Sequence, residues 1–442
     1  MAERKIQVLS VCTSDTGGGA ALAAYRIHKG VGVYEIDSQM FVKSKSREEK
    51  GVCSLKDFVP RGLVYRVFDW CLGKVRNKIQ HYRWSQYPKR DNYYKSDMRG
   101  TSVHGALQKL SYDILHLHWV NGRFLDLREL RKIDKPIVWT LHDSWPFCGV
   151  CHYFLDCEEY QRECGKCPQL GSNDAEDLSH KVWKAKQRIY EGLDLHIVTP
   201  SQWLADCARK SGLFKGLDIR VIPNCLDTES FRPMGKDEME ETVKGTGNEA
   251  VKQVVGKCLS AEGSDAPCIL YGAVNALTDK IKGLEYLISA LKELDAHGFC
   301  ANLVVFGVEQ SDLPLSFSHI SVDFVGFIHD ASVMAVLYNL SDITVVPSQS
   351  ENLSYVCMES LACGTPVVAF DVGGIPDMVE HKKNGYLAKR GDSGDLAHGI
   401  EWCLKNNEDK SLSANARDKI KKGCSIDVVA RQYVSLYNEI KR

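Results

Sequence analysis

The chain has 442 residues, of which 44% are hydrophobic and 26% charged, values typical of a globular protein with two or three domains. Lys and Arg together number 56 against 57 Asp and Glu, so the net charge of −1 excludes a strong overall attraction to nucleic acid. No run of eighteen apolar residues occurs, and the charged opening leads directly into an apolar segment, so neither a signal peptide nor a membrane span is expected.

The first predicted strand, residues 6–11, is followed by a glycine run and then by a helix that reaches about His28. The run consists of Gly17, Gly18 and Gly19. Glycine lets the backbone approach a phosphate closely, and the start of a helix leaves amide groups pointing outward. The sequence therefore indicates a phosphate-binding turn, with an ordinary tight turn as the alternative.

Residues 61–99 combine ten Lys or Arg and several aromatic side chains with only three Asp. Such a mixture suits contact with an anionic membrane surface, or the entry of a lipid-linked acceptor. A solvated basic face is the alternative, and no nucleic acid partner is expected.

Further strands are predicted in the first half at residues 114–118, 136–141, 195–199 and 219–222, with helical segments between them. Strands that alternate with helices favour parallel sheets. Three histidines, His116, His118 and His142, fall at the ends of two of these strands. A histidine at such a place is often only a core residue, and this alternative is strongest for His116.

The 17 cysteines include a cluster within the segment 145–171, made up of Cys148, Cys151, Cys157, Cys164 and Cys167. Two C-x-x-C pairs separated by a short loop are the spacing that tetrahedral zinc selects. Two local disulfides or free thiols are the alternatives. Because no export signal is evident, we expect reduced thiols and a cytoplasmic protein, with the inner membrane face as a peripheral location.

The second half begins after a polar stretch, residues 235–267, which we expect to be a linker with an exposed insertion. Strands are predicted at 269–272, 303–307 and 322–327. Lys280 and Lys282 precede a predicted helix at 284–297. They are either ligand-binding cations or two solvated lysines at a helix start.

A buried strand at 343–346 ends at Pro347, and a short helix follows from about Ser354 to Ala362. Glu351 lies in the loop at the carboxyl end of the strand, where open α/β sheets bind ligands, and Glu359 lies within the helix. Free backbone amides at the helix start favour phosphate, and they belong to Leu353, Ser354, Tyr355 and Val356. Two carboxylates that flank a phosphate site suit a nucleotide sugar, and an ordinary helix with a charged first turn is the alternative.

This run, with Gly364-Thr365-Pro366 and Gly373-Gly374 after it, resembles the paired-glutamate signature of the retaining glycosyltransferases of family 4. The resemblance implies an α/β protein of the GT-B fold, in which two Rossmann-like parallel-sheet domains face a central cleft. It also implies that Glu351 contacts the transferred sugar and that Glu359 contacts the ribose of the donor.

The same resemblance assigns the other site residues. The glycine loop at 17–19 would face the donor across the cleft, and Lys282 would stabilise the departing diphosphate. The family usually adds an arginine where this chain has Ala273, and Lys280 is our candidate substitute. His142, in Thr140-Leu141-His142-Asp143, matches the position that lines the acceptor side; we expect it to position the sugar, with its charge state helping the transition state.

The resemblance also implies a domain plan. Residues 1–234 would form the acceptor domain, 235–267 the linker and 268–425 the donor domain, while 426–442 would form a helix that packs back on the first domain. The cysteine segment is similar to the colanic-acid and exopolysaccharide branch of these enzymes. That likeness implies zinc ligands at Cys151, Cys157, Cys164 and Cys167, with Cys148 outside the site.

The sequence thus predicts a retaining glycosyltransferase that moves a hexose from a nucleotide-diphosphate sugar to a saccharide acceptor, lipid-linked or on a growing polysaccharide. No cofactor is expected for catalysis, and a structural zinc is expected in the cysteine segment. The alternatives are a nucleotide-sugar epimerase on the same fold and a catalytically silent sugar-binding scaffold. A phosphorylase would need a pyridoxal-binding lysine region, and none is evident.

Overall fold

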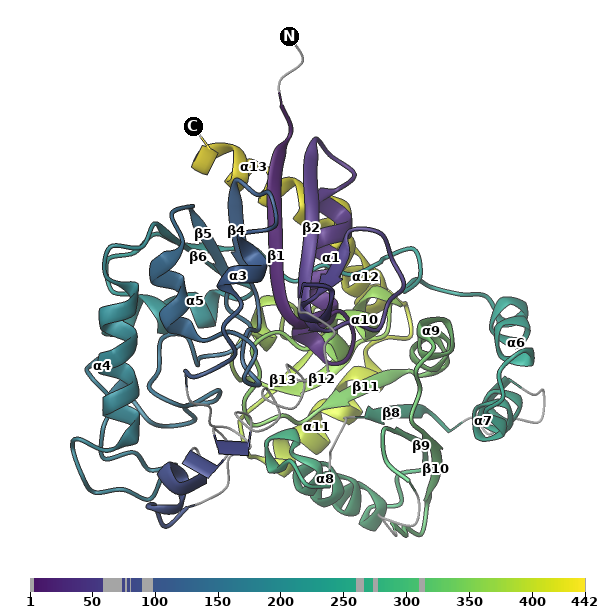
Figure 1. Cartoon of the computed structure of the whole chain (residues 1–442). Coiled ribbons are helices and arrows are strands. Elements are labelled where there is room, and N and C mark those ends of the chain that lie inside the picture. Colours follow the sequence, from purple (N-terminus) through teal and green to yellow (C-terminus); the bar gives the residue numbers. More distant parts are fainter. Residues whose placement is uncertain are drawn as a thin grey trace. The chain divides into compact units, whose positions relative to one another are not determined.

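The computed structural model describes residues 4–58, 74–75, 78–79, 81–89, 98–259, 266–272, 277–309 and 315–441 (Figure 1). The chain forms two compact units, one of Met1–Ile222 with Ala430–Arg442 and the other of Pro223–Val429. The division falls after Ile222 instead of at residue 234, and the C-terminal helix contributes to both units.

The first unit is built on a seven-stranded parallel sheet with the order β3-β2-β1-β4-β5-β6-β7. Its strands are β1 (Ile6–Ser14), β2 (Ile36–Ser44), β3 (Val52–Ser54), β4 (Ile114–Leu117), β5 (Ile137–Thr140), β6 (Leu195–Thr199) and β7 (Ile219–Val221). Every residue of β4 and β5 is buried, as expected for central strands covered on both faces. The strand order reverses between β1 and β4, and ligands of such sheets bind beyond the carboxyl ends at this reversal.

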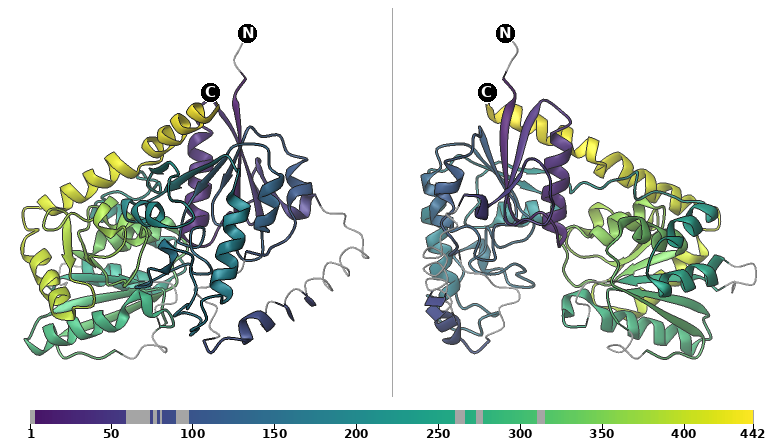
Figure 2. Two further views of the ribbon diagram at one scale, coloured as in Figure 1. Left: turned by 90° about the vertical axis from the view of Figure 1, so that its left-hand side faces the viewer. Right: turned by 45° about the vertical axis from the view of Figure 1, so that its right-hand side comes forward.

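The helices of the first unit include α1 (Gly19–Val31), α3 (His104–Leu107), α4 (Leu178–Tyr190) and α5 (Gln202–Lys210). Side chains cap the starts of α4 and α5: Asp177 accepts a bond from the Ser179 amide at 2.8 Å, and Ser201 accepts one from the Leu204 amide at 3.1 Å. Helix α13 (Ile426–Lys441) ends near the amino ends of β1 and β4, where Lys441 pairs with Asp113 at 2.7 Å (Figure 2).

The second unit is built on a six-stranded parallel sheet with the order β10-β9-β8-β11-β12-β13, which reverses between β8 and β11. Its strands are β8 (Cys268–Gly272), β9 (Ala301–Phe306), β10 (Ile320–Gly326), β11 (Ile343–Val346), β12 (Val367–Phe370) and β13 (Gly385–Ala388). Its helices include α8 (Leu284–Ala296), α9 (Ala331–Leu340), α10 (Tyr355–Ala362), α11 (Ser393–Lys405) and α12 (Ser411–Cys424).

The expected linker at 235–267 is instead largely helical, as α6 (Lys236–Lys244) and α7 (Glu249–Leu259). Val251, Val254 and Val255 recur at helical spacing and are buried in the core of the second unit. These helices contact α9 and β10, and the Asn248 amide donates to the Val325 carbonyl at 2.8 Å. The polar composition of the stretch concealed this narrow apolar face.

Within the described parts of the chain, no helix has both the length and the apolar character needed to cross a membrane.

Candidate active site

The second unit brings Lys282 and Glu351, 69 residues apart in the sequence, into direct contact at the carboxyl edge of its sheet. The Lys282 Nζ lies 3.0 Å from the Glu351 Oε2, and their side chains are 24% and 14% exposed. A charged pair that is partly shielded from water but still open to it can bind a polar ligand more strongly than a fully solvated pair.

Two glycines fix the loops that carry this pair. Gly283 has a φ of 69°, and a Cβ on it would lie 1.8 Å from the Pro347 carbonyl oxygen. Gly373 has a φ of 56°, and a Cβ there would lie 1.7 Å from the Glu351 carbonyl oxygen. Only glycine permits both the left-handed backbone and the close approach. The loops after β8, β11 and β12 therefore meet around Glu351.

Helix α10 begins directly after Glu351 and points its first amides toward the same edge of the sheet. The Ser354 Oγ caps the helix by accepting a bond from the Cys357 amide at 3.4 Å, and the first turn holds no acidic residue. Leu353 and Ser354 are buried, while Tyr355 and Val356 are half-buried. The partial positive charge of this helix start favours an anion such as a phosphate.

Glu359 is half-buried one turn further along α10 and accepts a hydrogen bond from the Tyr338 hydroxyl at 3.1 Å. Tyr338 lies on α9 and is fully buried. Burial and the adjacent Glu359 raise the pKa of Tyr338 well above its usual value, so its hydroxyl keeps the proton and donates. Sequence reasoning missed Tyr338, because its only signal is a phenol within an otherwise apolar helix.

Lys280 and Lys282 lie in one 3-10 turn, Lys280–Lys282, whose start is capped by the buried Asp279. Lys282 contacts Glu351, whereas the Lys280 side chain is exposed. The two lysines thus have different surroundings. Ala273, at the position where the family usually has an arginine, lies outside the described residues.

In the first unit, Gly17, Gly18 and Gly19 form the turn between β1 and α1. Gly17 and Gly18 have φ values of 79° and 82°, which residues other than glycine rarely adopt, although a Cβ on either would meet no atom of the described residues within 4 Å. Asp15, fully buried just before them, accepts bonds from the Ser46 and Arg47 amides at 2.9 and 2.8 Å. The glycines are exposed, so their amides are open to a ligand.

His142 follows β5 and is half-buried, with its Nε2 3.2 Å from the Nδ1 of His118. Burial lowers the pKa of His142 to about 4, against a smaller upward effect of Asp143. The imidazole is therefore neutral near pH 7. Desolvation disfavours the charged form of the ring, and the role of His142 beside the sugar stays a prediction.

Asp143 is a residue that sequence reasoning missed. Its carboxylate accepts bonds from the His152 Nδ1 at 2.7 Å, the Trp119 Nε1 at 2.8 Å and the Trp145 amide at 2.9 Å. Burial alone would raise the pKa of Asp143, but His152 and these donors outweigh it and hold the pKa below its usual value. The carboxylate thus ties the loop after β4 and the cysteine segment to the strand end that carries His142.

The five clustered cysteines line one small cavity of about 10 Å³ and are all free thiols. Among the residues that the structure describes, no three His, Cys, Asp or Glu side chains are placed to hold a metal ion. The expected zinc site at Cys151, Cys157, Cys164 and Cys167 is therefore not supported. Cys148, Cys151 and Cys167 are buried, whereas Cys157 and Cys164 are half-buried.

Lys186 of α4, which was not singled out from the sequence, holds this segment from inside. It is fully buried and donates to the carbonyls of Cys148 at 2.8 Å and Gly149 at 3.0 Å, and to that of Trp145. Its Nζ also lies 3.7 Å from the centre of the Trp145 ring. Burial lowers the pKa of Lys186 to about 7, against smaller upward effects of the nearby thiols and Asp143.

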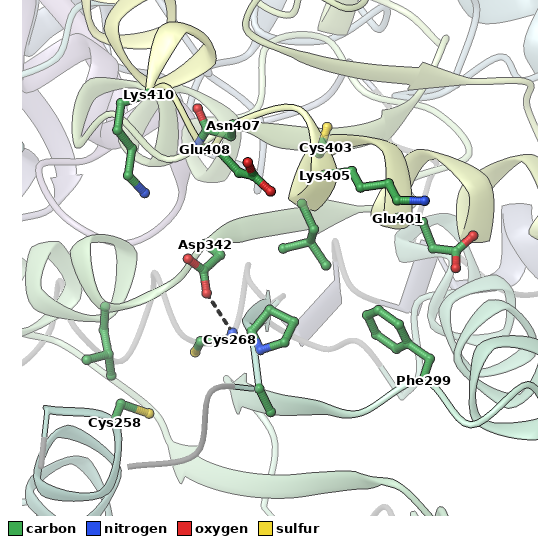
Figure 3. A pocket seen from close by; sticks show the side chains of 14 residues that line it. Cys258, Cys268, Phe299, Asp342, Glu401, Cys403, Lys405, Asn407, Glu408 and Lys410 are labelled. Carbon is green, nitrogen blue, oxygen red and sulfur yellow. Dashed lines mark hydrogen bonds between the residues drawn. The ribbon is translucent and has the colours of Figure 1, made fainter. Parts of the chain in front are cut away.

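A separate pocket of about 730 Å³ lies at the amino ends of β8 and β11 (Figure 3). Its lining includes Cys258, Cys268 and Asp342, and the Asp342 Oδ2 accepts a bond from the Cys268 amide at 2.8 Å. Because Glu351 lies at the opposite edge of the same sheet, this pocket is not part of the candidate active site.

The basic and aromatic segment 61–99 lies mostly outside the described residues, so its expected membrane contact stays a prediction.

Both units match known protein families. Residues 67–230 match the family model described as Glycosyltransferase Family 4, and residues 262–419 match the model described as Glycosyl transferases group 1. The second match contains Lys282, Glu351 and Glu359, and the first contains His142 and the cysteine segment.

Relatives in sequence are also glycosyltransferases. An uncharacterized glycosyltransferase of Methanocaldococcus jannaschii is 32% identical over 75% of this chain and 77% of its own length. The D-inositol 3-phosphate glycosyltransferase of Corynebacterium jeikeium is 26% identical over 66% of this chain and 64% of its own length. A protein of Escherichia coli named as the colanic acid biosynthesis glycosyl transferase WcaC is 26% identical over 59% of each chain. The chain thus spans less than two thirds of the last two relatives.

Solved structures share the architecture. Sucrose-phosphate synthase from Thermosynechococcus elongatus aligns over 99% of both chains with a TM-score of 0.63 and 18% identity. HepE from Anabaena aligns over 98% of this chain and 100% of its own, with a TM-score of 0.60 and 15% identity. At these identities the likeness concerns the fold alone, whereas the M. jannaschii relative establishes the family. The chain is therefore a glycosyltransferase that belongs to family 4 and has the GT-B fold of two Rossmann-like, parallel-sheet units.

Proposed function

We propose that this glycosyltransferase moves a hexose from a nucleotide-diphosphate sugar to a hydroxyl of a saccharide acceptor, with retention of the anomeric configuration. The observation that carries the proposal is the contact of 3.0 Å between Lys282 and Glu351, beside the start of α10. A cation, a carboxylate and the amides of a helix start at one sheet edge match a diphosphate joined to a polyol.

The donor is proposed to lie along α10. The first amides of the helix, from Leu353 to Val356, would hold the diphosphate, and Glu359 would accept bonds from the ribose hydroxyls. The carboxylate of Glu351 would accept bonds from hydroxyls of the transferred sugar. HepE was solved with UDP-glucose and starch synthase IV of Arabidopsis thaliana with ADP, which supports a nucleoside diphosphate as the leaving group.

In the reaction, the bond between the anomeric carbon and the diphosphate oxygen breaks, and a bond from that carbon to the acceptor oxygen forms. The acceptor hydroxyl loses its proton to the leaving diphosphate, so no separate base is required. Lys282 would offset the charge that develops on that diphosphate. An ammonium has three N–H donors, so Lys282 can contact a phosphate oxygen while keeping its bond to Glu351.

The first unit is proposed to supply the glycine turn at 17–19 as a further phosphate contact and His142 as a neutral sugar-positioning group. WcaC supports a polysaccharide or oligosaccharide acceptor, and a lipid-linked form of that acceptor stays a prediction. Lys280, which is exposed, is proposed as a secondary phosphate contact at most.

A screen of nucleotide sugars with oligosaccharide acceptors tests this function. We expect acceptor-dependent release of the nucleoside diphosphate, and a product whose new linkage has the anomeric configuration of the donor by NMR. A Glu351→Gln variant, which keeps the side-chain size, is the matched control and should lose most of the turnover. Epimerisation of the donor without diphosphate release would instead support the epimerase alternative.

A further inference from the structure

Three histidines of the first unit form a row that the proposed function leaves largely unused. The rings of His116 and His118 lie 4.1 Å apart between centres, and those of His118 and His142 lie 5.4 Å apart in a stacked arrangement. His116 and His118 are buried, and His142 is half-buried at the end of the row.

The inner end of the row is fully hydrogen-bonded. The His116 Nδ1 lies 2.7 Å from the Tyr437 hydroxyl and its Nε2 lies 2.8 Å from the Thr140 hydroxyl. The Tyr433 hydroxyl lies 2.9 Å from the same Thr140 oxygen. Two tyrosines of α13 therefore fix His116, and the ring of His116 supports that of His118.

His118 has a different pattern, because only one of its two ring nitrogens has a partner within the described part of the chain. Its Nδ1 lies 3.2 Å from the His142 Nε2, while its Nε2 is buried and has no hydrogen-bond partner among the described residues. A neutral imidazole carries one proton, on either nitrogen. If the proton were on Nε2, a buried N–H group would be left unsatisfied, which is rare in folded proteins.

We propose that His118 is a positioning residue that donates its Nδ1 proton to the His142 Nε2 and so fixes His142 in the tautomer protonated at Nδ1. His142 then offers an N–H donor, and not a basic nitrogen, to an oxygen of the sugar. This inference rests on the proposed function, because it deepens the role given there to His142. It makes His142 a hydrogen-bond donor in the ground state, consistent with a reaction in which the leaving diphosphate takes the acceptor proton.

The tautomer of His142 can be determined in the free protein by ¹⁵N NMR of labelled histidine. The signals of His142 are those that disappear in a His142→Ala variant. We expect the His142 Nδ1 to show the shift of a protonated ring nitrogen and the Nε2 that of an unprotonated one. The opposite pattern overturns the proposal. This measurement needs no substrate, so it stays decisive even if the proposed donor or acceptor class is wrong.

Two variants of His118 with side chains of similar size distinguish a role in positioning His142 from a role in packing alone. In His118→Asn the side-chain amide can occupy the place of Nδ1 and keep a donor, whereas His118→Leu fills space without one. We expect His118→Leu to lower kcat by about tenfold or more through misplacement of His142, and His118→Asn to retain most of it. Nucleoside diphosphate affinity, assigned to the second unit, should be unchanged in both. Equal losses in the two variants, with both folded by circular dichroism, would show that His118 only fills space.

Discussion

The polar side chains of the two candidate sites differ in charge. Those of the second unit are charged, whereas the histidines of the first unit are neutral. In the second unit, Lys282 and Glu351 form an ion pair that is partly open to water at the carboxyl edge of the sheet. In the first unit, His116 and His118 are buried and neutral, and burial holds the pKa of His116 at about 3. Charges that remain near water can hold a charged diphosphate, whereas neutral rings with fixed protons can orient a hydroxyl without attracting anions.

Acid should lower the free energy of unfolding of the first unit more than that of the second. This is the largest effect that we expect. His116 and His142 take up protons near pH 6.5 when unfolded but only near pH 3 and 4 when folded, because burial disfavours the charged ring. Between these values the unfolded state binds more protons, so stability falls as the pH falls. The loss should approach about 1.4 kcal/mol per pH unit for each such histidine.

Tryptophan fluorescence can follow this transition, because Trp402 is the only one of the 8 tryptophans that lies in the second unit. Urea unfolding monitored at pH 6.5 and at pH 5 should show a clear loss of stability in the first unit. A His116→Gln variant has one titrating ring fewer and should flatten the dependence. Equal stability at the two pH values would contradict the neutral, buried state of the row.

Replacement of Lys282 tests the charged half of the comparison. Lys282→Ala should lower kcat by about 10²-fold or more, as removal of other electrostatic stabilisers does. Lys280→Ala is the matched control, since its side chain is exposed, and it should have a much smaller effect. Steady-state release of nucleoside diphosphate at saturating donor measures both. If Lys280→Ala had the larger effect, the wrong lysine would have been assigned to the leaving group.

Local patterns in the sequence predicted most elements of this fold. The strands from β4 to β7 and from β8 to β11 lie close to the expected segments, because short apolar runs between turns indicate buried parallel strands. Helices α6 and α7 were missed because charged residues dominate their composition. Each helix has only a narrow apolar stripe, and this stripe is buried because it packs against the neighbouring α9 and β10.

The residues of the candidate site could be predicted from the sequence one by one, but the contacts between them could not. Glu351, Glu359 and Lys282 were all named from their motifs, yet the ion pair depends on two loops that glycines bring together. His116 and Tyr437 are 321 residues apart in the sequence. No local sequence pattern could therefore predict the hydrogen bond of 2.7 Å between them. The zinc expectation rested on the C-x-x-C spacing and on the likeness to the exopolysaccharide branch, and neither determines whether the side chains converge with the geometry that a metal requires.

Replacement of Glu359 tests the proposed ribose contact. Glu359→Gln keeps the shape but removes the charged acceptor, and should weaken nucleoside diphosphate binding by about 1–3 kcal/mol. Isothermal titration calorimetry with the diphosphate alone measures this without any acceptor. Unchanged affinity would contradict the assignment of Glu359 to the donor.

The smallest expected effect concerns Tyr338, which would act through Glu359. Tyr338→Phe removes the hydroxyl that donates to Glu359 at 3.1 Å, and should weaken diphosphate binding by about 0.5–1.5 kcal/mol. Tyr437→Phe is the matched control, because it removes a buried hydroxyl of the same kind from the first unit and should leave this affinity unchanged.

A double-mutant cycle then decides whether Tyr338 acts through Glu359 or only through packing. If the phenol serves to orient the carboxylate, Tyr338→Phe should cost little further affinity once Glu359→Gln is present, and the two effects should not add. Additive effects would mean that Tyr338 stabilises α9 independently. The phenol would then belong to the core of the second unit, and Lys282 and Glu351 would be left as the polar contact that defines its site.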